Sequence, residues 1–110
     1  MREVTVARKM SRSAGLQPYA ETLQDLLRAR GDHDHVAVRA ARGHLVIELQ
    51  ADDAPPDTLA RASPLGGGDF GLSFRSHTGR WDPMPVVGSL EEVADGAVSL
   101  LGPYLDPQNL

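Results

Sequence analysis

The feature of this sequence that most constrains its fold is an alternation of apolar residues on both sides of Arg42 and Gly43. A two-residue turn at this point pairs Ala41 with His44, Ala40 with Leu45, Val38 with Ile47 and Val36 with Leu49. In this register every large apolar side chain of the segment except Val46 falls on one face, whereas a shift by one residue would scatter them over both faces. Glycine at the second turn position is compatible with the primed turns of tight hairpins. Residues 35–50 are therefore predicted to form a β-hairpin with one buried face.

Helical periodicity flanks this hairpin on the N-terminal side. An apolar stripe at helical spacing predicts a helix from about residue 17 to residue 30. The stripe consists of Tyr19, Leu23, Leu26 and Leu27. Pro18 suits the first helical turn, and Gly31 offers a stop.

A second helix is predicted near the end of the chain. Ser89 and Glu92 have the spacing of a capping box, in which each side chain satisfies a backbone N–H of the other residue. The apolar stripe that follows consists of Leu90, Val93, Ala94, Ala97, Leu100 and Leu101. Gly102 and Pro103 are expected to end this helix.

A second hairpin is predicted between these elements, with its turn at Thr78 and Gly79. Its first strand alternates the apolar residues Phe70, Leu72 and Phe74 with Gly71, Ser73 and Arg75. With this turn Trp81 lies opposite Ser76, on the same face as the two phenylalanines, which predicts a core residue. The alternative is a partly exposed tryptophan at the rim of a binding groove. Pro83 and Pro85 restrict the returning segment to an edge strand or an extended exit.

The segment between the two hairpins, residues 51–68, is predicted to be irregular. Acidic residues and prolines at its start are expected to break any strand. They are Asp52, Asp53, Pro55, Pro56 and Asp57. A short helical turn from Asp57 to Ala62 is the one element expected here.

These elements predict an α+β fold in the order α-β-β-β-β-α. Two antiparallel β-hairpins form one sheet, which is packed by an N-terminal and a C-terminal helix. A chain of 110 residues buries roughly 65% of its unfolded surface, enough for one core. We expect a single domain over residues 16–105, preceded by a basic segment over 1–15 that is flexible or a short edge strand, and followed by a C-terminal tail over 106–110.

The charge balance restricts the partners. Residues 1–15 carry a net charge of +3, so the rest of the chain carries -7 of the total of -4. Such an acidic body opposes nucleic-acid binding, although the basic segment could serve as an arm for an acidic partner. There is no cysteine, no signal-peptide apolar region and no run of about 18 apolar residues. We therefore expect a cytoplasmic protein without disulfides, membrane contact or nucleic-acid partner.

One candidate site is a metal site on the first hairpin. In an extended strand His33 and His35 point to the same side, and continuing the hairpin places them opposite Asp52 and Gln50, with Glu48 one pair further along. Two imidazoles and two carboxylates can hold Zn, Mn or Fe. The alternative is a solvated strand start with two surface histidines.

A second candidate site binds a ligand or partner around the second turn. Arginine and tryptophan are enriched at binding hot spots. The residues that we assign to this site are Arg39, Arg75, His77, Arg80 and Trp81.

The sequence contains no set of catalytic nucleophile and base, no phosphate-binding loop and no complete metal motif. We therefore predict a small acidic accessory module without catalytic activity or cofactor, which binds another protein or a second copy of itself through its sheet face or a strand edge. The alternative is a metal- or small-ligand-binding protein, or an enzyme, that uses His33, His35, Glu48 and Asp52.

Overall fold

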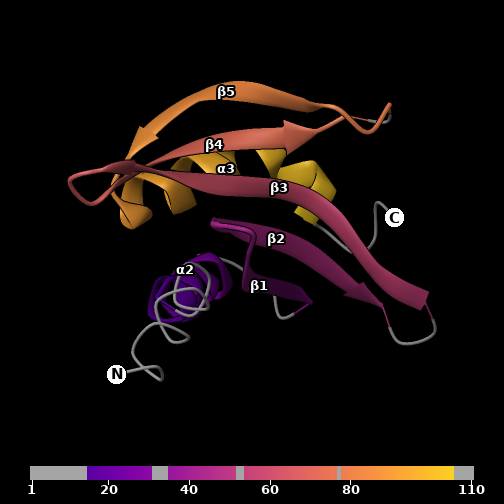
Figure 1. The fold of residues 1–110 in the computed structure, drawn as a ribbon. Helices are drawn as coiled ribbons and strands as arrows, with labels where there is room; N and C mark the ends of the chain where they lie inside the picture. Colours follow the sequence, from indigo (N-terminus) through magenta and orange to yellow (C-terminus); the bar gives the residue numbers. More distant parts are fainter. Residues whose placement is uncertain (1–14, 31–34, 52–53, 77, 106–110) are drawn as a thin grey trace, which may run out of the picture.

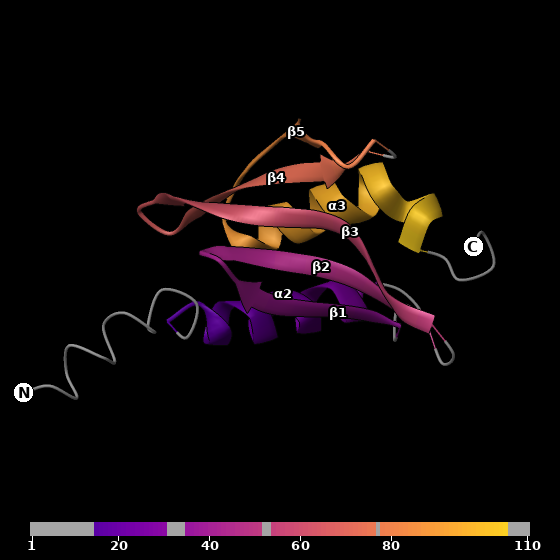
Figure 2. The ribbon, with the colours of Figure 1, turned by 45° about the vertical axis from the view of Figure 1, so that its right-hand side comes forward.

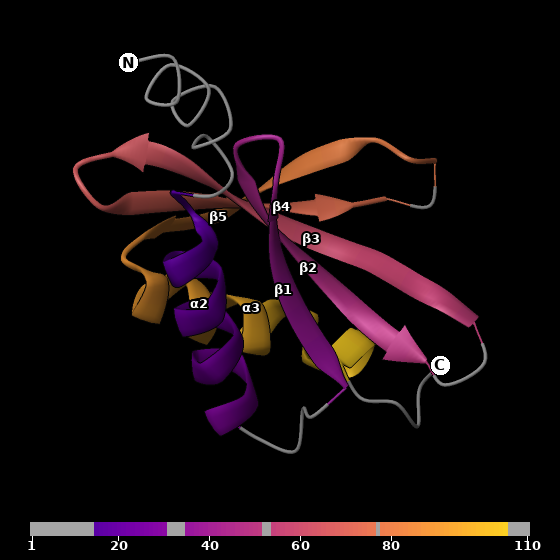
Figure 3. The ribbon, with the colours of Figure 1, turned by 60° about the horizontal axis from the view of Figure 1, so that its bottom comes forward.

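A computed structural model of the chain describes residues 15–30, 35–51, 54–76 and 78–105. The elements, labelled as in Figure 1, are α2 (Gln17–Ala29), β1 (Val36–Ala41), β2 (His44–Ala51), β3 (Ala54–Gly66), β4 (Asp69–Arg75), β5 (Trp81–Gly88) and α3 (Leu90–Leu105). The strands form one antiparallel sheet in the order β1-β2-β3-β4-β5. Both helices lie on one face of this sheet, side by side (Figures 2 and 3). The predicted α+β class, with two terminal helices on one antiparallel sheet, is confirmed.

The predicted register of the first hairpin is also confirmed. Val36 pairs with Leu49, and Ala41 pairs with His44 at the turn. Arg42 and Gly43 both have positive φ, at 52° and 81°, as a primed turn requires. The alternation of apolar residues and the glycine in the turn therefore agree on a single pairing.

The prediction of an irregular segment over residues 51–68 is wrong, because Ala54–Gly66 is β3, the central strand of the sheet. Pro55 and Pro56 fall where the register between β2 and β3 shifts, so neither proline interrupts a regular ladder. A second shift leaves Leu59 as an extra residue between two regular pairs, and its side chain is buried. The sheet thus has five strands rather than the four of the predicted order.

The register predicted for the second hairpin is wrong by one residue. Trp81 pairs with Arg75, not with Ser76. The turn is longer than two residues, because the N–H of Ser76 donates to the carbonyl of Arg80 at 2.9 Å. Side chains alternate between the faces of a strand, so this shift moves Trp81 to the face opposite Phe70. The expectation of an edge strand at Pro83 and Pro85 is confirmed, since both lie in β5.

The start of α3 has the predicted capping box. The N–H of Glu92 donates to Ser89 Oγ at 3.3 Å, and the N–H of Ser89 donates to Glu92 Oε1 at 3.2 Å. The predicted end at Gly102 and Pro103 is wrong, because the helix runs to Leu105. A proline in the last turn removes only one helical hydrogen bond, which explains why the helix can pass through it.

The core lies between the sheet and the two helices. It contains Ala20, Leu23, Leu27, Val36, Val38, Leu45, Ile47, Leu49, Leu59, Ala60, Ala62, Phe70, Leu72, Val93, Ala94, Ala97 and Leu101. Neither α2 nor α3 is long and apolar enough to cross a membrane. The predicted basic segment, apart from Gly15, and the predicted tail lie outside the described residues.

Helix α3 approaches β5 closely at Gly96. A Cβ atom at this position would lie 2.7 Å from both γ-methyl carbons of Val86. This distance is shorter than a van der Waals contact, and a β-branched side chain has little rotamer freedom to move away. Only glycine therefore fits here without displacing the strand or the helix.

We predict that Gly96→Ala lowers the free energy of unfolding by up to about 2 kcal/mol. Overpacking costs about 1–3 kcal/mol, and the gain of about 1 kcal/mol that alanine brings to a helix interior offsets part of this cost. Urea unfolding of Gly96→Ala, of Val86→Ala and of the double variant Gly96→Ala/Val86→Ala measures the coupling between the two positions. The double variant should lose less stability than the sum of the single variants, and a Gly96→Ala protein more stable than the natural one would contradict this packing.

Candidate functional site

The face of the sheet opposite the helices carries a row of polar side chains around Val46. Strand pairing aligns Arg39 on β1, Val46 on β2, Arg61 on β3 and Ser73 on β4. These side chains point away from the core, because their neighbours along each strand are buried against the helices. We call this surface the open face.

A hollow of about 320 Å³ lies on the open face. It draws residues from all five strands and from the first turn. We call it the arginine hollow, and it is lined by Arg39, Ala41, Arg42, His44, Val46, Thr58, Arg61, Arg75 and Trp81.

Trp81 holds two of these arginines. The guanidinium carbon of Arg61 lies 4.4 Å from the centroid of the Trp81 ring, and that of Arg75 lies 5.4 Å from it. Each such cation–π contact stabilises by about 0.5–1 kcal/mol at an exposed site, and by about 2 kcal/mol or more when water is excluded. The corrected register of the second hairpin is what brings Trp81 to these two side chains.

The charges of Arg61 and Arg75 are not balanced by a carboxylate in the described part of the chain. The ion pairs there join Arg30 to Asp95 in the helix layer, and Arg39 to Glu48 on the open face at 3.0 Å. The Nε of Arg61 is buried and has no hydrogen-bond partner among the described residues. Two like charges near one ring raise the free energy of the empty site, and a bound anion would lower it.

His44 lies at the edge of the arginine hollow. Its Nδ1 is 2.9 Å from Ser63 Oγ, within hydrogen-bond distance. Burial and, second, the positive charge of Arg61 lower the pKa of His44 below the ordinary value of 6.5. The imidazole is therefore neutral near pH 7 and adds no charge to the hollow.

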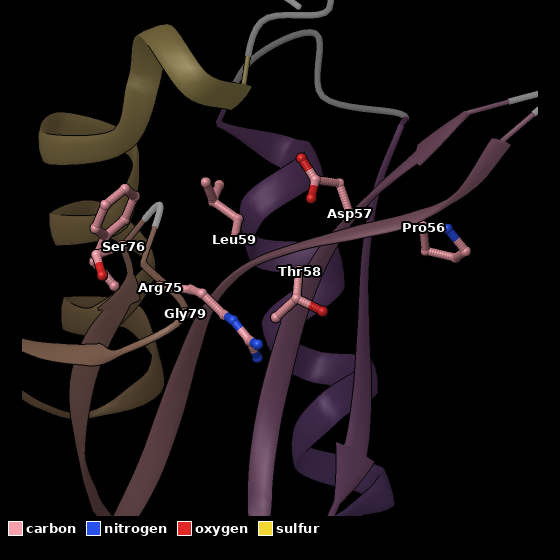
Figure 4. A pocket seen from close by; sticks show the side chains of 8 residues that line it. Pro56, Asp57, Thr58, Leu59, Arg75, Ser76 and Gly79 are labelled. Atoms are coloured by element: carbon pink, nitrogen blue, oxygen red, sulfur yellow. The ribbon is translucent and has the colours of Figure 1, made fainter.

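A second hollow of about 610 Å³ adjoins the first, where β3 and β4 separate. Pairing between these strands starts at Ala60 and Phe74, so the first half of β3 pairs with β2 alone. Thr58 and Arg75 line both hollows. In Figure 4 the side chains of Thr58 and Arg75 lie on one side of β3, whereas Asp57 and Leu59 lie on the other side. We call this second hollow the splay notch.

The structure brings together three residues of the predicted binding site. Arg39, Arg75 and Trp81 line the arginine hollow. Arg80 is exposed just before β5 and is not among the lining residues, and His77 lies outside the described residues.

Sequence reasoning missed Arg61, the closer of the two arginines that contact the ring of Trp81. The signal was present in Leu59-Ala60-Arg61-Ala62-Ser63, where small and polar residues alternate as in a half-buried strand. The prolines before this segment concealed it, because they predicted a break in place of a register shift.

The predicted metal site cannot be assembled from the described residues. His33 and Asp52 lie outside them. Glu48 pairs with Arg39, and the carbonyl of His35 accepts a hydrogen bond from the N–H of Gln50. The described ranges contain no group of three or more His, Cys, Asp or Glu side chains able to hold a metal ion.

No family model, curated protein or solved structure matches this chain. Its function is therefore argued from the geometry of the open face.

We predict that His44 makes the stability of the protein fall as the pH drops from about 7.5 to about 5.5. The folded pKa is lowered, so the unfolded chain, with a pKa near 6.5, takes up the proton first, and protonation favours unfolding below that pH. Comparing the free energy of unfolding of the natural protein with that of His44→Gln isolates this contribution from the other histidines. The natural protein should lose stability relative to the variant as the pH falls, and a difference that stays constant or moves the other way would contradict this account.

Proposed function

We propose that this chain is a non-catalytic binding module that holds a partner protein against the open face of its sheet. One observation carries the proposal. The helices cover one face of the sheet, while the other face presents a hollow lined by four arginines and a half-buried tryptophan. Tryptophan and arginine are the residue types that most often dominate binding energy at protein interfaces.

His44 and Ser63 on the open face resemble a catalytic base and nucleophile, but their surroundings are not those of a hydrolase, which supports a binding role. His44 and Ser63 are within hydrogen-bond distance, like a base and its nucleophile. In hydrolases, however, a carboxylate orients the histidine, and no carboxylate in the described part of the chain bonds to the imidazole of His44. Burial and Arg61 also lower its pKa, which makes it a weaker base.

The charge of the whole chain favours a protein partner over a nucleic acid. The chain has 15 acidic and 11 basic residues. Nucleic-acid binding requires an extended basic surface, whereas the arginines of the open face form a compact group. The partner is another protein or a second copy of this chain.

We predict that Thr58→Trp weakens partner capture, because Thr58 lines both hollows and the larger indole would obstruct the junction between them without altering any charge. Binding should weaken at least about tenfold, or about 1.4 kcal/mol. The matched control is Thr22→Trp, which places the same side chain on the exposed surface of α2. Affinity capture from extracts of the source cells, followed by light scattering for self-association, measures the effect.

The outcome that would contradict the proposal is a partner retained equally by Thr58→Trp and the natural protein. If native mass spectrometry shows a small molecule bound to the chain and no protein partner is found, the function would be small-ligand binding instead. The arginine hollow has the volume of a small-ligand pocket, for which about 300–1,000 Å³ is usual. That result would assign the face to a small anionic ligand.

A further inference from the structure

We propose that the ligand of the open face is an extended acidic segment of the partner protein, with carboxylates that bind Arg61 and Arg75. This inference depends on the proposed function, because it specifies the chemistry of the partner held there.

The arrangement of Arg61 and Arg75 suits carboxylates. A guanidinium that stacks on an aromatic ring keeps its N–H donors in its own plane, where they match the two oxygens of a carboxylate. Both groups lie over the ring of Trp81, at 4.4 Å and 5.4 Å from its centroid, so this contact restricts their side chains before a ligand binds. Neither arginine has to leave a carboxylate of the described chain before it binds another.

The acidic body opposes a long polyanion such as a nucleic acid, but it does not prevent binding of a short segment that stays on the open face. The Debye length at physiological ionic strength is about 8 Å, so carboxylates elsewhere on the surface are largely screened. Within the arginine hollow the positive side chains dominate, and Glu48 balances Arg39 alone.

The shape of the site favours a segment over a single small anion. Arg39 on β1 and Arg75 on β4 are three strand spacings apart, or about 14 Å at the usual spacing of about 4.8 Å. Thr58 and Arg75 connect the arginine hollow to the splay notch, which extends the site further. One phosphate or carboxylate spans only a small part of this length, whereas four or five extended residues cover about 14 Å, at roughly 3.3 Å per residue.

The edge of β3 in the splay notch makes side-chain recognition more favourable than strand addition. A segment that joined the sheet would need N–H donors along that edge. Pro55 and Pro56 have none, and prolines at exposed edges prevent such pairing. We therefore expect the guanidinium groups and Trp81, rather than the backbone of β3, to bind the partner segment.

Fluorescence of Trp81 tests this inference directly, because Trp81 is the only tryptophan of the chain. The probe is a peptide of about ten residues that alternates glutamate and glycine, so that its carboxylates share one side when it is extended. Its twin carries glutamine in place of glutamate. We expect a saturable change with the glutamate peptide that weakens as salt rises, and no change with the twin.

Variants assign the response to the two arginines. Arg61→Gln and Arg75→Gln should each weaken binding of the glutamate peptide about tenfold or more, because each removes a charge-assisted hydrogen-bond donor. Arg30→Gln removes one positive charge from the helix layer and should bind like the natural protein. Thermal unfolding of each variant checks that the fold is retained.

Three results would overturn the inference. They are an unchanged Trp81 signal up to millimolar glutamate peptide, an equal response to the twin, and tighter binding of inorganic phosphate or of a short single-stranded DNA. The proposed function fails separately, if Thr58→Trp leaves partner capture intact. A partner that is lost from Thr58→Trp but retained by both arginine variants would keep the function and reject the acidic segment.

Discussion

The structure depends on β3, the strand that joins two hairpins into one sheet. Its C-terminal half pairs with β4, and it pairs with β2 between Ala54 and Ala62, apart from the residues at the two register shifts. Without it, β1–β2 and β4–β5 would be separate ribbons, and isolated hairpins are at best marginally stable in water. Ala60 and Ala62 of this strand are buried in the core, where α2 packs against β1 and β2 and α3 packs against β4 and β5.

The same strand explains why the open face is concave and charged. The extra residue at Leu59 and the shift at Pro55–Pro56 are bulges, which bend and twist a strand. Before Ala60, β3 and β4 diverge, and Arg61 lies one residue past this separation with its side chain over Trp81. The bulges of β3 thus both bury Leu59 in the core and position Arg61 on the open face.

The charge arrangement of the open face is unfavourable for stability alone. Two guanidinium groups approach one ring, and a buried N–H of Arg61 lacks a partner among the described residues. An unsatisfied buried donor costs about 1–3 kcal/mol. Natural proteins depart from local rules of this kind chiefly at functional sites, and other parts of the fold compensate for the loss. The unfavourable charge arrangement of the open face therefore supports its assignment as a binding surface.

The sequence predicted the elements whose signals are local. Arg42-Gly43 and the alternating residues around it specify one register, and Ser89 with Glu92 specifies one helix start. The errors arose where tertiary context overrides local signals. Pro55 and Pro56 resemble a break, whereas in the sheet they lie at a register shift against β2. The hydrogen bond from the N–H of Ser76 to the carbonyl of Arg80 closes a longer turn, which moves Trp81 by one position. Because alternation converts that single step into a change of face, Trp81 and Arg61 could not be placed together from the sequence.

The most direct test of the account is NMR of the arginine side chains. The Nε–Hε signals of Arg61 and Arg75 and the indole N–H signal of Trp81 would be followed during a titration with the glutamate–glycine peptide. The account predicts that these three signals shift together with one dissociation constant, while the Nε–Hε signal of Arg30 in the helix layer stays unchanged. Larger shifts for Arg30 than for Arg61 and Arg75, or equal shifts for all arginines, would contradict the assignment of the open face as the binding surface.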